Sequence, residues 1–358
     1  MAPDRGAPEG VPSSRGGVRG AVLGAVLTAA ALVPAAAAWS VVQAHSADAA
    51  VERVEIRSWP IRSFRIGSAQ TRFGPLEFVG GLEMASADRD FGALSAFRFL
   101  DPGGRIVGVA DTGFWFFGRL ERDAEGRPSG MADFTMQQMV GPRGKVIGDK
   151  GLTDAEGLAV RDGIATASFE RAHRVSEYRL DPADMKSQIR DLGYVIPPRE
   201  MRNNRGLETI AYAPKDGALA GARVVVSEKS LDRNGNIFAA IIEGPGQGVF
   251  TVARRGEFDI TDGAFLPDGD LLLLERSYAI SRGVGMRLRR IPSADIRKGA
   301  VADGEILFEA GMTYQIDNME GLDVWRRADG ALMVSLISDD NHSILQRNLY
   351  LEFVLHEE

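Results

Sequence analysis

The sequence predicts an all-β fold of the β-propeller class, and the main observation behind this prediction is a phrase that recurs five times. Each copy contains a short turn with an acid or Ser, an apolar run, a Gly turn and a second apolar run that ends in an acid. Marker residues of the five copies lie 61, 52, 54 and 58 residues apart; they are Ser95, Glu156, Glu208, Asp262 and Glu320. Repeats of about 50 residues are typical of radial or stacked arrays, in which no single unit buries its apolar face alone.

Each copy is expected to form a β-hairpin. The apolar runs are short, rich in Val, Leu, Ile and Phe, and joined by DG, PGG or PDG turns whose Gly accepts a positive φ. Helical periodicity is largely absent from them. A blade of four strands needs about 40 to 50 residues, so each interval leaves room for two further strands and for longer loops.

The two ends of the chain are expected to close the ring. Strand-like segments occur within residues 51–90, and another lies at 348–358, NLYLEFVLHEE. Pairing of terminal strands within one blade hides sheet edges that would otherwise be exposed. We therefore predict six blades, five from the repeated phrases and one shared by the two ends; five or seven blades are the alternatives.

The composition agrees with one propeller domain over residues 50–358. Apolar residues make up 44% of the chain and charged residues 25%, and the 42 Gly and 16 Pro suit a turn-rich all-β protein. The net charge of −7 argues against a nucleic-acid-binding protein. The absence of Cys excludes disulfides, thiolate zinc sites and Cys nucleophiles. We expect a monomer.

Residues 1–49 are expected to be an export signal. Arg15 and Arg19 precede an apolar run at 21–38, and small residues suited to cleavage follow at Ala38 and Ala49. This order predicts a periplasmic or secreted protein. The alternative is an anchor retained in a membrane through residues 21–38, because 18 apolar residues approach a spanning length. Only then would a membrane be a partner.

The repeated acids indicate a functional site. Every phrase has an acid at the end of its second apolar run: Asp111, Glu170, Glu228, Glu275 and Asp339. Equivalent positions of successive blades surround one axis, so these acids and the markers are expected to converge. Converging carboxylates suit Ca²⁺ or Mg²⁺. The simpler interpretation is that each acid accepts hydrogen bonds from turn amides or forms an ion pair between blades.

Taken in order, the phrases resemble the phytase-like family, which is described by an esterase-like activity of phytase. The resemblance rests on DAEGLAV followed by SFER, NRGLETIAYAP followed by VVVSEK, FLPDGDLLLLER, and DNMEGLDVWRRADG followed by SDDNHSILQR, and it extends over about residues 75–356. It implies a secreted bacterial β-propeller that hydrolyses phosphate or carboxylic esters. Carried over by position, it implies that the family's acids are Asp111, Asp154, Glu156, Glu170, Glu208, Glu228, Glu275, Glu320 and Asp339, with basic partners at Arg171, Arg276 and Arg347.

The chain departs from the family pattern at two places. The first phrase reads GALSAF, with Ala93 and Ala96 at or near positions where the family has Gly. His342 stands where an aromatic residue is more usual, and it follows a strand-end acid. A histidine beside a carboxylate can act as general acid for a leaving alcohol, and the alternative is a solvated loop histidine.

These residues favour a metal-assisted ester hydrolase that acts on a small anionic substrate. Carboxylates would hold Ca²⁺, and guanidinium groups would bind the anion. We assign metal binding to Asp154, Glu156, Glu208, Glu228, Glu320 and Asp339, substrate binding to Arg171, Lys229, Arg276 and Arg347, and catalysis to Glu170, Arg171, Glu275, Arg276 and His342.

Two other functions fit the same residues. One is a noncatalytic propeller that binds a small anion or an envelope partner, and the other is a Ca²⁺-dependent, lactonase-like hydrolase. The fold cannot separate them, because propellers host both enzymes and binding modules. The sequence contains no G-x-S-x-G elbow, no H-E-x-x-H motif and no P-loop.

Overall fold

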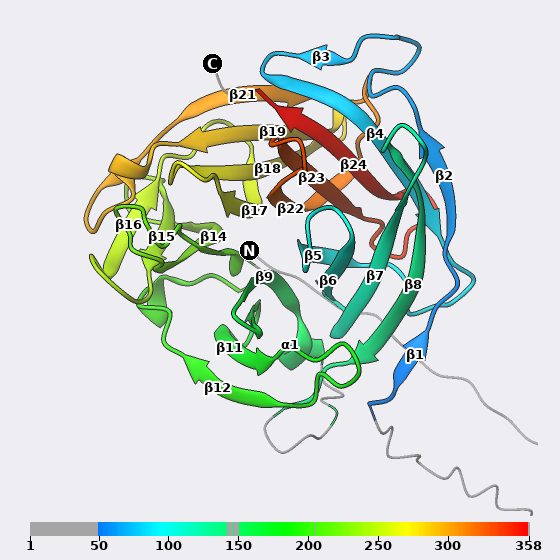
Figure 1. Cartoon of the computed structure of the whole chain (residues 1–358). Coiled ribbons are helices and arrows are strands. Elements are labelled where there is room, and N and C mark those ends of the chain that lie inside the picture. Colours follow the sequence, from blue (N-terminus) through cyan, green and yellow to red (C-terminus); the bar gives the residue numbers. More distant parts are fainter. Residues whose placement is uncertain (1–48, 142–145, 147–149, 204, 357–358) are drawn as a thin grey trace, which may run out of the picture. The chain divides into compact units, whose positions relative to one another are not determined.

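The computed structural model describes residues 49–141, 146, 150–203 and 205–356. In this part of the chain, five sheets surround one axis (Figure 1). Their innermost strands contact one another in sequence order, and the last contacts the first; they are β5 (Leu94–Phe99), β9 (Ala155–Arg161), β13 (Leu207–Tyr212), β17 (Asp259–Phe265) and β22 (Asn318–Arg326). The predicted β-propeller class is confirmed.

The first two blades are built almost entirely from consecutive strands. Blade 1 continues outward from β5 through β6 (Arg105–Ala110), β7 (Phe114–Arg122) and β8 (Pro128–Gln138) to the edge strand β1 (Val51–Arg53). Blade 2 continues from β9 through β10 (Ile164–Phe169) and β11 (Arg174–Arg179) to β12 (Gln188–Leu192). A short helix, α1 (Lys150–Thr153), precedes β9.

Blades 3 and 4 share a small exchange at their outer edges. Blade 3 continues from β13 through β14 (Arg223–Leu231), β15 (Ile237–Ile241) and β16 (Gly248–Val252), and β20 (Val301–Ala302) pairs parallel to β16. Blade 4 continues from β17 through β18 (Leu271–Ala279) and β19 (Gly283–Ile291) to β21 (Glu305–Ala310). Single 3-10 turns, η1 (Pro198–Glu200) and η2 (Ser293–Asp295), lie in the connections.

The fifth blade combines both ends of the described chain. It contains β22, β23 (Leu332–Asp339) and β24 (Asn348–Leu355), followed by β4 (Leu76–Ala85) and β2 (Arg57–Ile61), and β3 (Arg72–Phe73) pairs with β4. β24 and β4 are antiparallel, with Leu355 opposite Leu76 and Asn348 opposite Met84.

The predicted number of six blades is wrong, because the structure has five. The fifth repeated phrase supplies three strands of its blade, β22, β23 and β24. The N-terminal strands complete that blade instead of forming a sixth with the last strand.

The core lies between the blades, and the alternation of side chains along β18 shows how it is filled. Leu272 and Leu274 pack in a cluster with residues of blade 5, whereas Leu271 and Leu273 pack in a cluster with residues of blade 3. Successive side chains of a strand point to opposite faces, so a run of four leucines serves two interfaces at once. All four are fully buried.

A buried arginine joins the innermost strands across the axis. Both terminal nitrogens of Arg98, on β5, donate to the carboxylate of Asp262 on β17, at 2.8 and 2.9 Å. The same guanidinium donates to the carbonyls of Ile210 on β13 and Leu322 on β22. Asp262 also accepts the backbone N–H of Leu322. One ion pair therefore connects blades 1, 3, 4 and 5.

The predicted leader lies outside the described residues, except for its last residue. Ala49 is buried, and its carbonyl accepts a hydrogen bond of 2.7 Å from Nε2 of Gln137. In the part of the chain that the structure describes, no helix is long and apolar enough to cross a membrane.

Replacing Arg98 is expected to destabilise the propeller strongly. In Arg98→Met the carboxylate of Asp262 stays buried without its cation, and breaking such a pair costs about 3–5 kcal/mol. Urea unfolding of the variant measures this loss. Arg105→Met is the matched control, because Arg105 pairs with Asp101 at a side-chain exposure of 63%. An exposed pair contributes about 0–1 kcal/mol. Similar losses in the two variants would contradict the role of Arg98.

Candidate functional site

A β-bulge recurs near the start of the innermost strand in every blade. The register shifts between Leu207 and Thr209 in β13 and between Met319 and Gly321 in β22, so that Glu208 and Glu320 are the extra residues. The equivalent shifts of the other blades fall at Ser95, Glu156 and Thr261. A bulge re-aims the side chain that it carries. These positions form the first of two rings of equivalent residues around the axis.

The strand pairing also defines the second ring. In blade 3, Leu207 lies opposite Ser227, and Glu228 follows Ser227. The matching pairs in the other blades are Leu94 with Ala110, Ala155 with Phe169, Ile260 with Glu275, and Met319 with Ser338. In each blade, the residue directly after the second member of the pair belongs to the second ring. These residues are Asp111, Glu170, Glu228, Arg276 and Asp339.

The structure corrects two residues of the fourth repeat. The ring position expected for Asp262 belongs to Thr261, and the one expected for Glu275 belongs to Arg276. Asp262 instead pairs with Arg98. Glu275 is buried and forms ion pairs with Arg287 and the fully buried Arg289. The fourth blade therefore contributes a cation where the other blades contribute acids.

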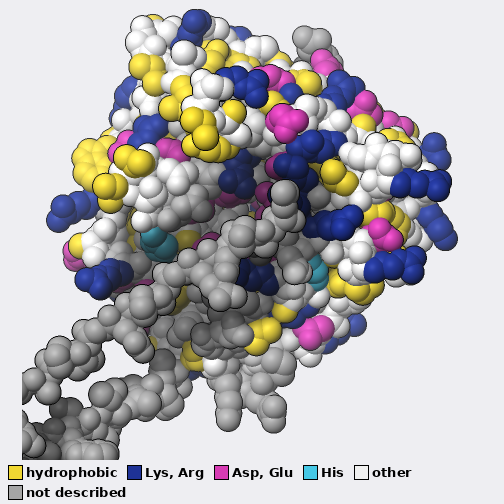
Figure 2. Space-filling model, turned by 180° about the vertical axis from the view of Figure 1, so that it is seen from behind, with side chains coloured by type: hydrophobic (Ala, Val, Ile, Leu, Met, Phe, Trp, Pro, Cys, Tyr) yellow, Lys and Arg dark blue, Asp and Glu magenta, His cyan; other side chains and the backbone are white. Residues whose placement is uncertain are grey.

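The two rings surround a cavity of about 210 Å³ at one mouth of the axial channel. Its lining is Ser95, Asp111, Glu156, Glu170, Glu208, Glu228, Arg276, Glu320, Asp339 and Asn341. Figure 2 views the molecule from a side where the surface is hollowed, with acidic side chains inside the hollow and Lys and Arg side chains at its edge. The structure thus brings together most of the acids that the sequence placed in the site.

Two overlapping groups of carboxylates have the spacing that a metal ion requires. The first consists of Asp154, Glu156 and Glu170, and the second of Glu170, Glu208 and Glu228. In each group, one oxygen of every carboxylate lies within 4.8 Å of the others. Glu170 belongs to both groups, and all five residues come from blades 2 and 3. Oxygen ligands at this spacing suit a hard divalent cation.

Burial and mutual repulsion favour the protonated acids in this cavity. Burial raises the pKa of Glu170 to about 7 and that of Glu320 to about 7, and burial together with the charge of Glu320 raises the pKa of Asp339 to about 8. Burial, followed by the charges of neighbouring acids, raises the pKa of Glu156 and Glu208 well above the ordinary range. A cation in the cavity would favour the deprotonated acids at neutral pH.

Arg276 lies among these acids and compensates part of their charge. Its Nη1 is 3.2 Å from Oε1 of Glu320 and also donates to Oδ1 of Asn318. Its Nη2 is 3.4 Å from Oε1 of Glu228. Arg276 thus bridges blades 3 and 5. Blade 2 adds the carboxyl groups of Asp154, Glu156 and Glu170, so the single positive charge of Arg276 cannot balance all the acids of the site.

Arg171 stands at the edge of the site. Its Nε donates to Oδ2 of Asp154 at 2.6 Å, and almost half of its side chain is exposed. Its backbone has a φ of 56°, in the left-handed region that is uncommon for residues other than Gly. The residue before it, Glu170, accepts the N–H of Gly206 through Oε1 at 3.0 Å.

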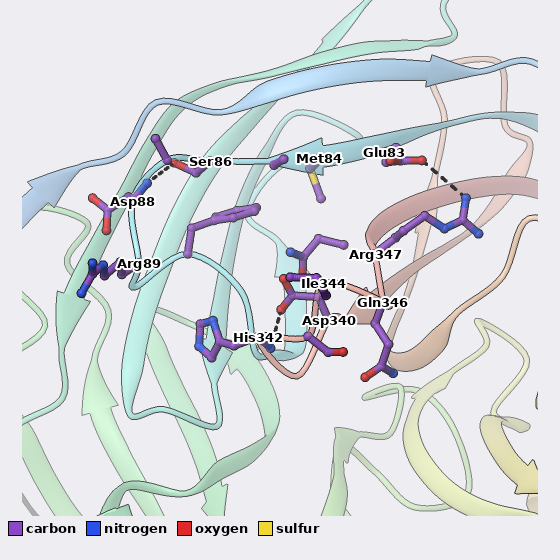
Figure 3. Close-up of a pocket in the computed structure, with 15 residues that line it drawn as sticks. Glu83, Met84, Ser86, Asp88, Arg89, Asp340, His342, Ile344, Gln346 and Arg347 are labelled. Carbon is purple, nitrogen blue, oxygen red and sulfur yellow. Dashed lines mark hydrogen bonds and ion pairs between the residues drawn. The ribbon is translucent and has the colours of Figure 1, made fainter.

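Three other residues assigned from the sequence do not line the acidic cavity. Nζ of Lys229 forms an ion pair with Asp259 at 2.7 Å. His342 and Arg347 line a separate pocket of about 630 Å³ between the end of β4 and the loop after β23 (Figure 3). There Arg347 is paired with Glu83 at 3.4 Å, and His342 is exposed.

Sequence reasoning missed two polar residues of the site, Asn318 and Asn341. Asn318 donates through Nδ2 to Oε1 of Glu320 and accepts from Arg276, so it fixes two groups of the cavity. Asn341 lines the cavity with a φ of 47°. The phrase DNMEG contains Asn318 two residues before the marker Glu320, which is the one signal that could have pointed to it.

Fold and cavity together define a β-propeller with a carboxylate-rich site at one mouth of its channel. The model of the phytase-like family, described as esterase-like activity of phytase, matches residues 89–342, more than half of the chain. The chain belongs to this family, as the resemblance of its phrases indicates.

Comparison with curated proteins gives no match. Among solved structures, an endo-arabinase from Bacteroides thetaiotaomicron VPI-5482 is similar, with 13% identity, coverage of 75% of this chain and 96% of that chain, and a TM-score of 0.46. Sqt1 from Saccharomyces cerevisiae has 9% identity, coverage of 86% and 73%, and a TM-score of 0.33. A bifunctional GH43-CE protein of Bacteroides eggerthii has 10% identity, coverage of 75% and 34%, and a TM-score of 0.38. Similarity this low does not bear on activity.

The raised pKa values predict that the metal-free protein loses stability as the pH rises. Glu170, Glu320 and Asp339 have folded pKa values of about 7, 7 and 8, above those of the unfolded chain. From about pH 4 to pH 8 the folded state therefore binds more protons, and its free energy of unfolding falls with increasing pH. In excess chelator, scanning calorimetry should show a fall in Tm of at least about 4 °C between pH 5 and pH 8.

Added Ca²⁺ should remove most of this fall at pH 8, because it binds the deprotonated acids of the folded state. A Tm that is constant or rises over the same range in chelator would show that the acids do not repel one another as the structure implies.

Proposed function

We propose that this protein is a divalent-metal-dependent hydrolase of phosphate or carboxylic esters. The observation that carries the proposal is the convergence of carboxylates from four blades on a cavity that contains one arginine. Membership in the phytase-like family, whose description names an esterase-like activity, supports the reaction class.

The residues present fit Ca²⁺ by the chemistry of their donors. The two groups of metal-compatible spacing offer only carboxylate oxygens, which come from Asp154, Glu156, Glu208 and Glu228 in addition to Glu170. The cavity lining supplies too little positive charge to neutralise these carboxylates. Glu320 and Asp339, both from blade 5, add two further carboxylates to the lining of the cavity. A divalent cation would supply Lewis acidity and charge neutralisation for an ester oxygen.

Arg276 is the group best placed to orient the anionic part of the ester. It is the only cation among the residues that line the described cavity, and it is held from both sides by Glu228 and Glu320. A guanidinium fixed in this way is pre-organised, so little side-chain entropy is lost when an anion binds. Arg171, held by Asp154 at the edge, is the second candidate.

Glu170 is the group best suited to move a proton. The N–H of Gly206 occupies Oε1, so Oε2 can accept a proton from the attacking water. Burial raises its pKa to about 7 without a metal, and a bound cation would lower that pKa, so that Glu170 would be deprotonated and able to accept a proton near neutral pH. Hydrolysis adds the water oxygen to phosphorus or to the carbonyl carbon, and the alcohol leaves with a proton.

We also propose export of the protein. The apolar run at 21–38 supports a leader, and the buried Ala49 with its hydrogen-bonded carbonyl favours cleavage near Ala38 over cleavage after Ala49. Sequencing of the N-terminus of protein isolated from the periplasm or medium tests this proposal.

Glu208→Gln should lower calcium affinity without a matching loss of stability. The substitution removes one carboxylate from the second group and relieves repulsion in the metal-free state, so calorimetric titration should show at least about tenfold weaker binding. Glu275→Gln is the matched control, because Glu275 lies in the ion pairs with Arg287 and Arg289 outside the cavity. It should lower stability and leave calcium affinity unchanged. The reverse pattern would identify Glu208 as a structural residue.

Arg276→Lys should impair hydrolysis although the charge is retained. Lysine cannot present two parallel donors, and loss of such a donor costs about 10²-fold in kcat. The assay is release of phosphate or alcohol by the calcium-loaded protein from a panel of phosphomonoesters, phosphodiesters, short acyl esters and lactones. Arg190→Lys is the control, because Arg190 is exposed and pairs with Glu177 on blade 2. If no member of the panel is hydrolysed, the noncatalytic binding module becomes the better account.

A further inference from the structure

Exposed apolar side chains are concentrated at the tips of two neighbouring blades. On the hairpin between β18 and β19, Tyr278 is 70% and Ile280 is 95% exposed. On the loop between β23 and β24, Ile344 and Leu345 are 101% and 87% exposed, and Met312, in the connection to blade 5, is 59% exposed. We call these five residues the apolar tips. Large apolar side chains this exposed are costly in water, so a cluster of them indicates a binding surface.

The segments that carry the apolar tips contact one another. Met312 lies against the β18–β19 hairpin, since a Cβ on Gly283 would come within 2.7 Å of its Cγ. The connection 312–317 then contacts the other loop, because the N–H of Arg347 donates to Asp317 and its Nη1 donates to Gln315. The N–H of Ile66, another exposed residue, donates to the carbonyl of Thr313. The apolar tips therefore belong to one continuous surface.

This surface is positively charged in a protein that is negative overall. The segments 64–67, 278–284, 312–317 and 342–347 contain three arginines and one acid, the buried Asp317, which lies 3.6 Å from Nε of Arg347, whereas the whole chain has a net charge of −7. Arg347 is paired with Glu83. Arg65 and Arg282 are exposed and form no ion pair with any residue that the structure describes. Two cations without an ion-pair partner among the described residues thus stand among the apolar tips.

The apolar tips lie beside the mouth of the acidic cavity. Arg276 lines the cavity and Tyr278 follows it by two residues, and Asn341 lines the cavity in the same loop as Ile344. In Figure 2, hydrophobic side chains also gather beside the hollow. Whatever covers the apolar tips is therefore brought close to the cavity.

We propose that the apolar tips dock the propeller onto an anionic lipid surface. Apolar side chains that enter the boundary between headgroups and acyl chains, together with basic residues that contact anionic headgroups, are the two features of interfacial binding. Ile280, Ile344 and Leu345 supply the first, and Arg65 and Arg282 supply the second. The proposal does not depend on hydrolysis at the acidic cavity.

A fluorescent label at the apolar tips tests the proposal in the full chain. The sequence has no Cys, so Ile280→Cys and Leu345→Cys each provide one thiol for an environment-sensitive fluorophore. With vesicles of phosphatidylglycerol and phosphatidylcholine in equal parts, the emission at both positions should rise at least about twofold and should be quenched by lipids that carry a spin label in the upper acyl chain. The label reports whether its own position enters the lipid. A chain that is attached to the vesicle only through residues 21–38 would not bury the label.

Ile189→Cys is the matched control, because Ile189 is 47% exposed on β12, the outer strand of blade 2. Its label should not respond. Arg65→Glu with Arg282→Glu should raise the vesicle concentration needed for half of the signal at position 345 by at least about tenfold.

Three results would overturn the proposal. The first is an equal response at position 189. The second is an equal response to vesicles of phosphatidylcholine alone, which would remove the role of the arginines. The third is a rise with protein concentration in the absence of vesicles, which would make the partner a second copy of the chain.

Discussion

The ion pair between Arg98 and Asp262 is the constraint on which the arrangement of the blades depends. Its guanidinium is satisfied by groups on β5, β13, β17 and β22, and the carboxylate is satisfied by the same guanidinium and two backbone amides. A buried pair of this kind contributes little net stability when complete and costs much when broken. Its main effect is therefore to fix position: the innermost strands of four blades can approach the axis in only one register. Most side chains of the two rings at the channel mouth lie on these strands, or on or directly after the strands paired with them, so their positions are fixed as well.

The acidic cavity follows from a local irregularity that is repeated in every blade. A bulge at the start of each innermost strand turns one side chain towards the axis, and the end of the paired strand supplies a second. Five blades therefore yield ten positions, and nine of them line the cavity. The repeat alone would place acids all around the axis. The fourth blade breaks the pattern with Thr261 and Arg276, and this makes the site asymmetric: metal-compatible carboxylates lie on blades 2 and 3, and the arginine lies beside them on blade 4.

The sequence was sufficient for the propeller class and for most of the acids, because both are repeated and repetition is visible without a structure. It was insufficient wherever one residue of register mattered. Glu275 resembles Glu228 at the end of an apolar run, yet pairing of Ile260 with Glu275 turns Glu275 into the sheet and moves Arg276 to the ring. Arg98 carried no signal at all, because its partners lie on strands more than 100 residues away. The predicted number of blades was wrong for a related reason. Which strands pair where the ring closes depends on contacts between the two ends of the chain.

The charge distribution constrains the order of events at the proposed site. In the metal-free cavity, any deprotonated acids present a negative surface that repels an anionic ester, and Arg276 is already engaged by Glu228 and Glu320. A cation held by the carboxylates of blades 2 and 3 would remove this repulsion and would lower the pKa of Glu170. The proposed function therefore predicts that the cation binds before the substrate. An approaching anion meets the local electric field at the site and not the net charge of −7. Exposed cations around the acidic cavity are therefore compatible with an anionic substrate.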